Sequence, residues 1–398
     1  MTTAPRVRVA LIGAGMVGRA HAHAYRALHE ILETVEVQLA VVADADEALA
    51  ADAERRYGFE RRASSWETVA EARDVDAVSV ALPNFQHREV AEALLASGKH
   101  VLCEKPLAPN ARDAWALLQA ARRAGVVHAV GFNLRRAPCV AAIQHVVARG
   151  ELGQPQQFLG RYLTDYAASP ETPFTWRYVR AKAGSGALGD VGSHIIDLAH
   201  FLLGPIERIL GADLATYVPR RPIPAGHVIG HAHAATTGEF GSVDTDDVAS
   251  FTARFQNGAV GQIACSRIAT GYRNVPAFEL IGSRGAASFD MERPAEFQIF
   301  RSDEGDASGF RRVVASPAHP YFAESVVMSV AGVGYGYRET FVGQALEFIR
   351  AIAGQRQIYA PSFEDGYRAA LVCEAVQEAA EQGRAVSLAE VAARAESA

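Results

Sequence analysis

A glycine loop close to the start of the chain is the feature that most restricts its fold. An apolar run at residues 7–12 leads into the loop at 13–18, and an alanine- and leucine-rich stretch follows as far as Leu32. The order of strand, glycine loop and helix is typical of a nucleotide-binding unit, whose helix N-terminus offers free N–H groups to a phosphate. The first glycine allows the tight turn, the second admits the pyrophosphate, and the third lets the helix lie close to the strand. We therefore predict that a dinucleotide binds at Gly13, Gly15, Met16, Val17 and Gly18.

Further apolar runs predict the sheet that surrounds this loop. Strand-like runs at 37–43, 76–82, 100–103 and 126–131 alternate with helical stretches, a pattern that favours an α/β fold with a doubly wound parallel sheet. We assign residues 1–133 to this Rossmann domain. Ligands of such sheets lie beyond the carboxyl ends of the strands. One polar residue there could be a solvated loop residue, but the set at this edge favours a binding site: Asp44, Asn84 after Pro83, Glu104, Lys105 and Asn133.

Asp44 ends the second predicted strand and decides the expected cofactor. A carboxylate at that position accepts hydrogen bonds from the ribose hydroxyls and repels a 2′-phosphate. Asp46 is a competing candidate, but it is better suited to cap the helix that begins at Glu47. Ala45, and not an arginine, follows Asp44. The sequence therefore favours NAD over NADP.

The remainder of the chain, residues 134–398, predicts an α+β domain with a large, mostly antiparallel sheet. Asn257-Gly258 is a strong hairpin signal, and Gly204-Pro205 ends a predicted helix at Leu203. The predicted helices could cover only one face of the sheet, so apolar surface on the other face suggests a homodimer or homotetramer. The strand-like runs are 155–166, 207–218, 248–255, 259–268, 277–281 and 286–290, and the predicted helices are 189–203, 339–353 and 363–381.

Composition limits the classes of partner. A chain of 398 residues suggests two domains. The formal charge of −6 and the lack of a Lys/Arg-rich stretch argue against nucleic acid. No apolar run reaches the roughly 18 to 20 residues that span a bilayer, which argues against a membrane protein. The four cysteines are scattered without a CxxC pair, so we expect reduced thiols and a cytoplasmic location.

Two polar clusters are candidates for chemistry. Lys105 precedes Pro106, which restricts the lysine backbone and so aims its side chain. Asp190, His194 and Asp197 are spaced i, i+4 and i+7, which places them on one face of a helix. The alternative is a carboxylate that interacts with the helix dipole beside a core histidine. A lysine together with this cluster favours combined proton and hydride transfer.

Two other segments leave alternatives open. His227, His231 and His233, with Asp244, Asp246 and Asp247 nearby, have the composition of a metal site, but their spacing matches no zinc pattern and we predict no metal. Trp176-Arg177 is either a core aromatic beside a surface arginine or part of the wall around the cofactor or sugar.

With these motifs in hand, the chain resembles the glucose-fructose oxidoreductase, inositol dehydrogenase and MocA family (Gfo/Idh/MocA) over nearly its full length. The matching pieces are residues 13–18, Pro83-Asn84 with His87, residues 98–107 around Glu104-Lys105-Pro106, and residues 189–194 with Asp197. The resemblance implies NAD or NADP in the Rossmann half, a sugar, cyclitol or related polyol against the open sheet, and catalytic roles for Lys105, Asp190 and His194. We assign further cofactor contacts to Pro83, Asn84, His87, Glu104, Lys105, Trp176 and Arg177, and substrate contacts to Lys105, Asn133, Asp190, His194, Asp197, Tyr335 and Tyr337.

Within the family, several stretches are similar to levoglucosan dehydrogenase and related sugar C3-dehydrogenases, namely residues 131–136, 176–177, 184–190 and 334–337. This resemblance implies NAD-dependent oxidation of a secondary hydroxyl of a sugar, anhydrosugar or cyclitol to a ketone. His194 would take or relay the hydroxyl proton, Lys105 would polarise the oxygen, and Asp190 would orient the pair. The alternatives are a ketosugar reductase and a glycoside hydrolase that retains NAD without net redox change. Retention of all three residues argues against a non-enzymatic NAD-binding regulator.

The assignment of Asp44 predicts the cofactor preference. NAD should bind more tightly than NADP, because a 2′-phosphate would meet a carboxylate at short range. Replacing Asp44 by Ser or Ala should narrow that preference in titrations with both cofactors. A wild-type preference for NADP of about tenfold would show that the assignment is wrong.

Overall fold

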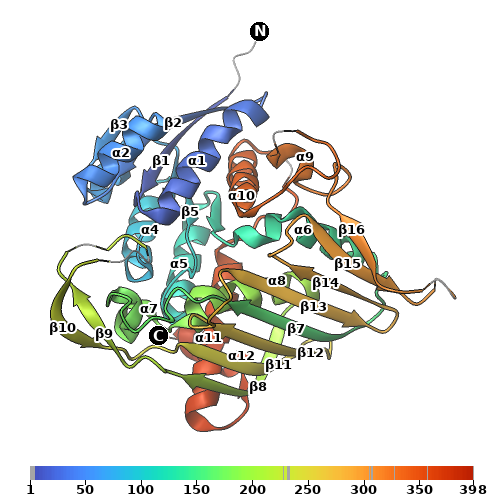
Figure 1. Ribbon diagram of the computed structural model, residues 1–398. Helices are drawn as coiled ribbons and strands as arrows, with labels where there is room; N and C mark the ends of the chain where they lie inside the picture. Colours follow the sequence, from blue (N-terminus) through green and yellow to red (C-terminus); the bar gives the residue numbers. More distant parts are fainter. Residues whose placement is uncertain are drawn as a thin grey trace. The chain divides into compact units, whose positions relative to one another are not determined.

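The computed structural model describes residues 5–397 except 227, 231–233, 304, 306, 307, 327 and 356. The chain forms two compact units, which are considered separately (Figure 1). Unit 1 comprises residues 1–108, 113–136 and 338–367. Unit 2 comprises residues 109–112, 137–337 and 368–398. Within the part of the chain that the structure describes, no helix is long and apolar enough to cross a bilayer.

Unit 1 is built on a six-stranded parallel sheet in the order β3-β2-β1-β4-β5-β6. In this order β1 and β4 are neighbours at the centre of the sheet, as expected for a doubly wound fold. The predicted parallel sheet is confirmed, and the short edge strand β3 is an addition to it. The elements are β1 (Arg6–Ile12), α1 (Met16–Ile31), β2 (Glu36–Ala43), α2 (Glu47–Tyr57), β3 (Arg61–Ala63), α3 (Trp66–Glu71), β4 (Ala77–Val80), η1 (Asn84–Gln86), α4 (His87–Ala96), β5 (His100–Cys103), α5 (Ala111–Ala124), β6 (His128–Val130), η2 (Asn133–Arg136) and α10 (Tyr337–Ile352).

The core of unit 1 joins segments from both ends of the chain. Val9 and Leu11 of β1 and Leu28 of α1 are buried together with Leu346 and Ile349 of α10. Helix α10, which the sequence analysis assigned to the second domain, therefore packs in the core of the nucleotide-binding unit. Burial of its apolar side, and not its position along the chain, decides where this helix belongs.

The glycine loop brings β1 and α1 into close contact. A Cβ atom at Gly18 would lie 1.8 Å from the carbonyl oxygen of Gly13. Gly13 itself has a φ of +93°, a backbone conformation that residues other than glycine rarely adopt. A Cβ atom at Gly15, in contrast, would have no described heavy atom within 4 Å. Gly13 and Gly18 are thus needed for the turn and the packing, whereas the space at Gly15 lies open at the helix N-terminus.

Unit 2 contains a nine-stranded sheet in the order β16-β15-β14-β13-β7-β12-β11-β8-β17. Its neighbours are antiparallel except for β7 and β12, which run parallel. The predicted large, mostly antiparallel sheet is therefore confirmed. The elements are α6 (Pro138–Ala148), β7 (Pro155–Leu163), η3 (Trp176–Tyr178), α7 (Arg180–Ala183), η4 (Leu188–Gly192), α8 (Ser193–Leu203), β8 (Ile206–Ala215), β9 (Arg220–Pro224), β10 (Thr236–Ser242), β11 (Val248–Phe255), β12 (Val260–Ser266), β13 (Val275–Gly282), β14 (Gly285–Asp290), β15 (Glu296–Arg301), β16 (Arg311–Val314), α9 (Phe322–Ser325), α11 (Phe363–Gln382), β17 (Val386–Ser387) and α12 (Leu388–Ser397).

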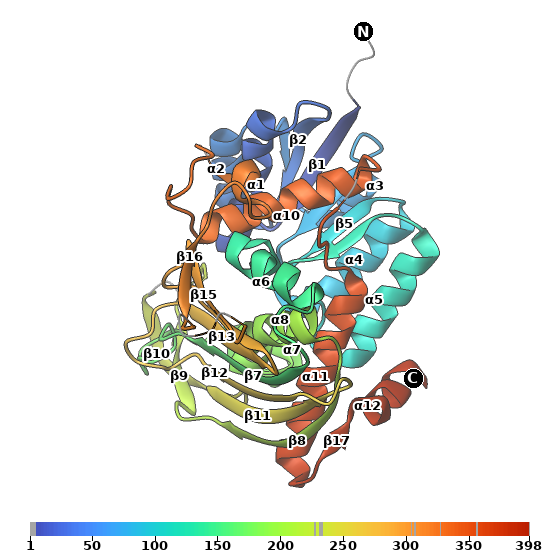
Figure 2. The same cartoon turned by 90° about the vertical axis from the view of Figure 1, so that its right-hand side faces the viewer.

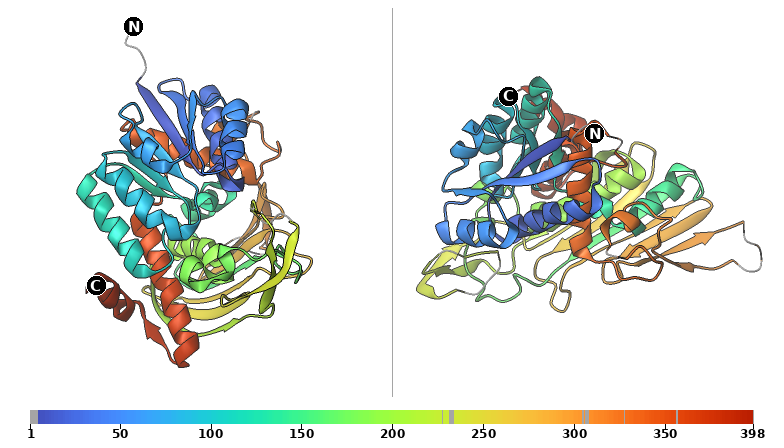
Figure 3. Two further views of the ribbon diagram at one scale, coloured as in Figure 1. Left: turned by 90° about the vertical axis from the view of Figure 1, so that its left-hand side faces the viewer. Right: turned by 90° about the horizontal axis from the view of Figure 1, so that it is seen from above.

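Helices α6, α7 and α8 lie over one face of the large sheet, and none of the described helices covers the other face (Figure 2). Strands β9 and β10 form a separate two-stranded ribbon beside the large sheet (Figure 3). The hairpin predicted at Asn257-Gly258 is confirmed between β11 and β12, with Gly258 at a φ of +90°. The α-helices and strands of unit 2 that were not predicted from the sequence are α6, α7, β9, β10, β15, β16, α9, β17 and α12. Most of them are short, but α6 is an apolar helix of 11 residues.

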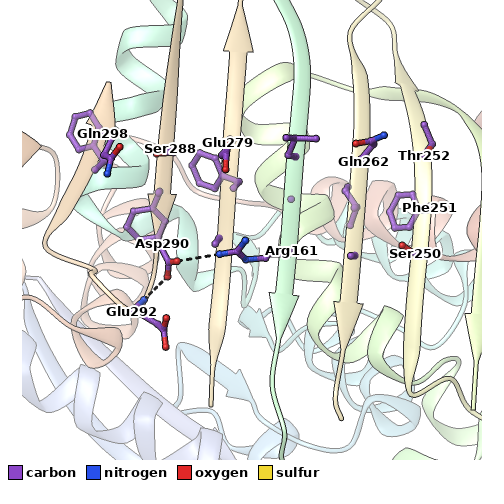
Figure 4. Close-up of a pocket in the computed structure, with 18 of the residues that line it drawn as sticks. Arg161, Ser250, Phe251, Thr252, Gln262, Glu279, Ser288, Asp290, Glu292 and Gln298 are labelled. Carbon is purple, nitrogen blue, oxygen red and sulfur yellow. Dashed lines mark hydrogen bonds and ion pairs between the residues drawn. The ribbon is translucent and has the colours of Figure 1, made fainter. Parts of the chain in front are cut away.

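The open face of the sheet is mixed in character, because polar side chains stand beside apolar ones such as Leu159 and Ala264. Figure 4 shows Arg161, Ser250, Thr252, Gln262 and Glu279 projecting from neighbouring strands on this face. Together with other residues they line a hollow of about 950 Å³. The alternation of the strands puts most apolar side chains on the opposite face, under the helices. The apolar surface expected on this face is therefore interrupted by charged and polar side chains.

The contrast between Gly18 and Gly15 gives a test of the loop. Gly18→Ala should lower the free energy of unfolding by about 1–3 kcal/mol or more, because the new methyl group meets backbone that cannot rotate away. Gly15→Ser should leave stability within about 0.5 kcal/mol, because serine suits a helix N-cap, yet it should weaken NADH binding. Guanidinium denaturation and NADH fluorescence titration measure the two effects. Equal stability of the two variants would contradict the packing role of Gly18.

Candidate functional site

The glycine loop of unit 1 is held by the carboxylate of Asp44. Its Oδ2 accepts a hydrogen bond from the backbone N–H of Ala14 at 2.7 Å, and its Oδ1 accepts one from Asp46 N–H at 2.9 Å. Asp46 caps α2 by accepting from the N–H groups of Ala48 and Leu49, as predicted. Asp44 therefore joins the end of β2 to the loop between β1 and α1. Its contact with the ribose stays a prediction.

The open N-terminus of α1 fits the phosphates of a dinucleotide. Space at Gly15 leaves the backbone N–H groups of the first turn accessible, and the Met16 side chain is 53% exposed beside it. The residues that would hold the cofactor here are the predicted ones, Gly13, Gly15, Met16, Val17 and Gly18, the last three of which belong to α1. Free N–H groups and the positive end of a helix dipole favour an anion at this position.

His87 ties together two loops at the carboxyl end of the same sheet. Its Nε2 lies 2.9 Å from the carbonyl oxygen of Leu82, and its Nδ1 lies 3.0 Å from that of Pro106. Burial lowers the pKa of His87, although the nearby carbonyl oxygens oppose the shift. A neutral ring donates to one of these oxygens at a time. His87 is thus a link between the Pro83-Asn84 loop and the loop that contains Lys105.

The carboxylate of Glu104 is buried and holds the backbone of Lys105. Its Oε1 accepts from Nε2 of His21 at 2.9 Å, and its Oε2 accepts from the Lys105 N–H at 3.1 Å. His21 is joined on its other side to the hydroxyl of Ser79 at 3.1 Å. A Cβ atom at Gly131 would lie 2.3 Å from Oε1, so this position admits no side chain while Glu104 stays in place. The predicted cofactor residue Glu104 has, first of all, this internal role.

Sequence reasoning missed His21. It lies three residues after Gly18, on the buried side of α1, and is 2% exposed. A buried histidine has to find polar partners, and here they are Glu104 and Ser79. The available signal was the i+3 spacing from the last loop glycine, which turns His21 toward the sheet.

Asp190 and His194 of unit 2 lie on a π-helical turn and on the helix that follows it. The sequence predicted one helix over 189–203, but η4 precedes α8. The buried carboxylate of Asp246 explains the change, because it accepts hydrogen bonds from the N–H groups of Gly186 at 2.6 Å and Leu188 at 2.8 Å. These bonds fix the chain as it enters the turn. The predicted end of the helix at Leu203 is confirmed.

Strand β7 and the loop that follows it supply two tyrosines, which lie near these residues. The Tyr166 hydroxyl donates to Oδ2 of Asp190 at 2.6 Å. The ring of Tyr162 lies 5.8 Å from that of His194, centroid to centroid, and its hydroxyl donates to Asn274 at 2.7 Å. Burial is the main reason that the pKa values of both tyrosines rise well above the usual range. Both hydroxyls therefore stay protonated at neutral pH.

Tyr162 and Tyr166 are further residues that the sequence analysis left without a role. The available signal was their place at the carboxyl end of the strand predicted over 155–166.

Strand β7 can pass close beneath α8 because position 160 is a glycine. A Cβ atom there would lie 2.5 Å from Cγ2 of Ile195.

The other predicted substrate and cofactor residues have varied surroundings. Asn133 is 1% exposed and donates to Thr340 at 2.6 Å inside unit 1. In unit 2 the guanidinium of Arg177 lies over the ring of Trp176 at 4.5 Å. Asp197 and Tyr335 are buried, and Tyr337 is a neighbour of Tyr162 that contributes to its raised pKa. The contacts predicted for these residues with ligands stay predictions.

The structure thus groups the predicted residues in two sets. Lys105, Glu104, His87, Asp44 and the glycine loop belong to unit 1, whereas Asp190, His194, Trp176 and Tyr337 belong to unit 2. Joint action of Lys105 with His194 stays a prediction. No cluster of potential metal ligands occurs among the described residues, and His227, His231 and His233 lie outside them.

Comparison with known proteins gives family matches for both parts of the chain. Residues 7–132 match the model described as "Oxidoreductase family, NAD-binding Rossmann fold" (GFO_IDH_MocA). Residues 140–288 match the model of the GFO/IDH/MocA C-terminal domain.

Individual relatives cover almost the whole chain. Levoglucosan dehydrogenase of Pseudarthrobacter phenanthrenivorans is 39% identical over 97% of this chain and 99% of the relative. Inositol 2-dehydrogenase of Rhizobium meliloti is 28% identical over 96% and 99%. A solved structure described as levoglucosan dehydrogenase in complex with NADH and levoglucosan is 38% identical, has a TM-score of 0.88, and covers 96% of this chain and 99% of its own.

Proposed function

The chain belongs to the Gfo/Idh/MocA oxidoreductase family, and on that premise we propose that it is an NAD-dependent dehydrogenase of sugars, anhydrosugars or cyclitols. It oxidises a secondary hydroxyl of the substrate to a ketone. Levoglucosan is the favoured substrate, because the relative with 39% identity over 97% of the chain is a levoglucosan dehydrogenase. Inositol-type cyclitols are second, supported by the inositol 2-dehydrogenase.

The pairing of Asp190 with a tyrosine, one turn before His194, is the observation that carries this proposal. A carboxylate oriented by a neutral phenol at 2.6 Å is of the type that accepts hydrogen bonds from a hydroxyl or a cationic side chain. A histidine one turn further along is a suitable general base near neutral pH. The same element, Asp-x-Gly-x-His, carries the family resemblance in the sequence.

In the proposed mechanism, His194 takes the hydroxyl proton of the substrate while Lys105 polarises the same oxygen. Asp190 orients these groups and balances the charge of the lysine. The glycine loop and the N-terminus of α1 would hold NAD, which would supply the acceptor for the hydride that leaves the carbon. The backbone of Lys105 is held by Glu104 before any substrate binds. The segment around Lys105 therefore needs little rearrangement when the substrate binds.

Trp176, Arg177, Asn133, Asp197, Tyr335 and Tyr337 are the further ligand contacts of the proposal. Asp44 discriminates against a 2′-phosphate, which makes NAD the preferred cofactor. We also place the enzyme in the cytoplasm, which its four free cysteines support. The open face of the nine-stranded sheet is the proposed surface for pairing into a homodimer or homotetramer. Polar side chains on this face can form direct and water-mediated hydrogen bonds with the same face of a second subunit.

NADH formation with defined substrates tests the proposed function. The purified chain is incubated with NAD and levoglucosan, myo-inositol or glucose, and the absorbance of NADH is followed while the carbohydrate products are identified. One NADH for each ketone formed is the expected result. Hydrolysis of a glycoside without net NADH would support the NAD-retaining hydrolase instead, and efficient reduction of ketosugars alone would support the reductase.

Removal of the proposed catalytic side chains should abolish most of this activity. Lys105→Ala and His194→Ala should each lower kcat by about 10²- to 10³-fold, the usual contribution of a general base or an electrostatic partner. NADH should still bind to both variants, because neither residue is assigned to the pyrophosphate. Asp190→Asn should also be damaging through lost orientation. The wild-type rate should rise with pH as the base loses its proton. Near wild-type turnover of either alanine variant would refute the mechanism.

The oligomer proposal is tested by sedimentation. Sedimentation velocity at micromolar concentration should show a dimer or tetramer. Arg161→Glu places a carboxylate beside Asp290, with which Arg161 is paired at 3.5 Å, and should shift the distribution toward the monomer through repulsion on the open face. A wild-type profile that contains only monomer would contradict the proposal.

A further inference from the structure

We propose that Tyr166 is a positioning residue for Asp190 in the hydride-transfer reaction, an inference that rests on the proposed function. Its phenol holds one oxygen of the carboxylate and so sets the orientation of that group. Nothing in the sequence motifs assigns a role to this tyrosine. The inference starts from the hydrogen bond of 2.6 Å between the Tyr166 hydroxyl and Asp190 Oδ2.

The backbone around Tyr166 is fixed on both sides. Thr164 N–H donates to the carbonyl of Ser266 at 2.9 Å, and Ala167 N–H donates to that of Arg267 at 3.0 Å. These bonds continue the parallel pairing of β7 with β12 beyond the last strand residues. The tyrosine is therefore carried by the central part of the large sheet, and a site on such an element is better defined than one on a free loop.

A buried arginine secures the segment that follows. The guanidinium of Arg221 donates to the carbonyl oxygens of Ala167 at 2.7 Å and Ser169 at 3.0 Å. Arg221 is fully buried, and its guanidinium lies 4.4 Å from the ring centre of Tyr178. A buried arginine with carbonyl acceptors holds its position firmly, since loss of these bonds would leave buried N–H donors unsatisfied. Tyr166 thus has little freedom to move away from Asp190.

The charges behind the phenol are those of a buried ionic cluster. Arg267 donates to Asp247 at 2.8 Å, and the second arginine, Arg221, lies 3.9 Å from the same carboxylate. Asp246 lies nearby and is occupied by the backbone N–H groups of the η4 turn. Arg267 is the cation that acts on the Tyr166 phenol, and it opposes the effects of burial and of Asp190 on the pKa of that group.

These surroundings exclude Tyr166 as the base of the reaction. Burial, and then the Asp190 charge, raise the pKa of the phenol well above its usual range, so at neutral pH the hydroxyl keeps its proton and donates it in a hydrogen bond. A donor of this kind stabilises the ionised form of the carboxylate. The role that remains is to orient Asp190 and to keep it charged.

The test is kinetic and compares two single-atom changes. Tyr166→Phe removes only the hydroxyl, and Tyr321→Phe, which removes the hydroxyl of a buried tyrosine elsewhere in unit 2, is the control. Wild type and both variants are assayed with NAD and levoglucosan over a range of pH, and NADH binding is titrated separately. Tyr166→Phe should lower kcat by about tenfold, as expected for loss of one hydrogen bond to a charged group. It should move the acid limb of the kcat/KM profile to higher pH and leave NADH affinity unchanged, whereas the control should match the wild type.

The outcomes separate this inference from the proposed function. If wild type reduces NAD and Tyr166→Phe has the same kcat and the same pH profile, the positioning role is wrong and the proposed function stands. If kcat falls without a shift of the acid limb, or the control behaves like Tyr166→Phe, the effect is structural and the inference is also wrong. If none of the sugars or cyclitols tested allows the wild type to reduce NAD, the proposed function is wrong, and the inference is wrong with it.

Discussion

Close approach of one backbone to another, at glycines that leave no room for a side chain, is the constraint on which both units depend. In unit 1 a Cβ atom added at Gly18 would lie 1.8 Å from the carbonyl oxygen of Gly13. In unit 2 the Gly186 position meets the carbonyl of Asp246 at the same distance. The first contact sets the helix that would receive the pyrophosphate, and the second sets the turn that carries Asp190. The two halves of the proposed site are thus fixed by packing of the main chain before any side chain acts.

In each unit a side chain that is buried or partly buried then holds a reactive segment. Glu104 binds the Lys105 N–H and is itself held by His21. Asp190 accepts from Tyr166, which is anchored on the large sheet. Groups of this kind lie behind the reacting residues and limit their freedom, which favours the reactive geometry over the many others that a free side chain would sample.

The sequence predicted the framework better than the supports of the site. The glycine loop, the strand at 100–103 and the hairpin at Asn257-Gly258 follow from local patterns, because each depends on neighbouring residues alone. The π-helical turn at Asp190 depends on Asp246, more than fifty residues away in the chain, and no local pattern could indicate it. The same holds for His21 and Tyr166, whose partners come from other elements. The mixed character of the open sheet face was readable from strand alternation, but only once the buried side of each strand was known.

Lys105 and His194, which belong to different units of the chain, are proposed to act on one substrate hydroxyl. A double-mutant cycle on kcat with Lys105→Ala, His194→Ala and the combined variant measures whether they do. Residues that act as a unit have strongly non-additive effects, so we expect the combined variant to be within about tenfold of the slower single variant. Losses that multiply, as for independent sites, would show that the two residues do not act together.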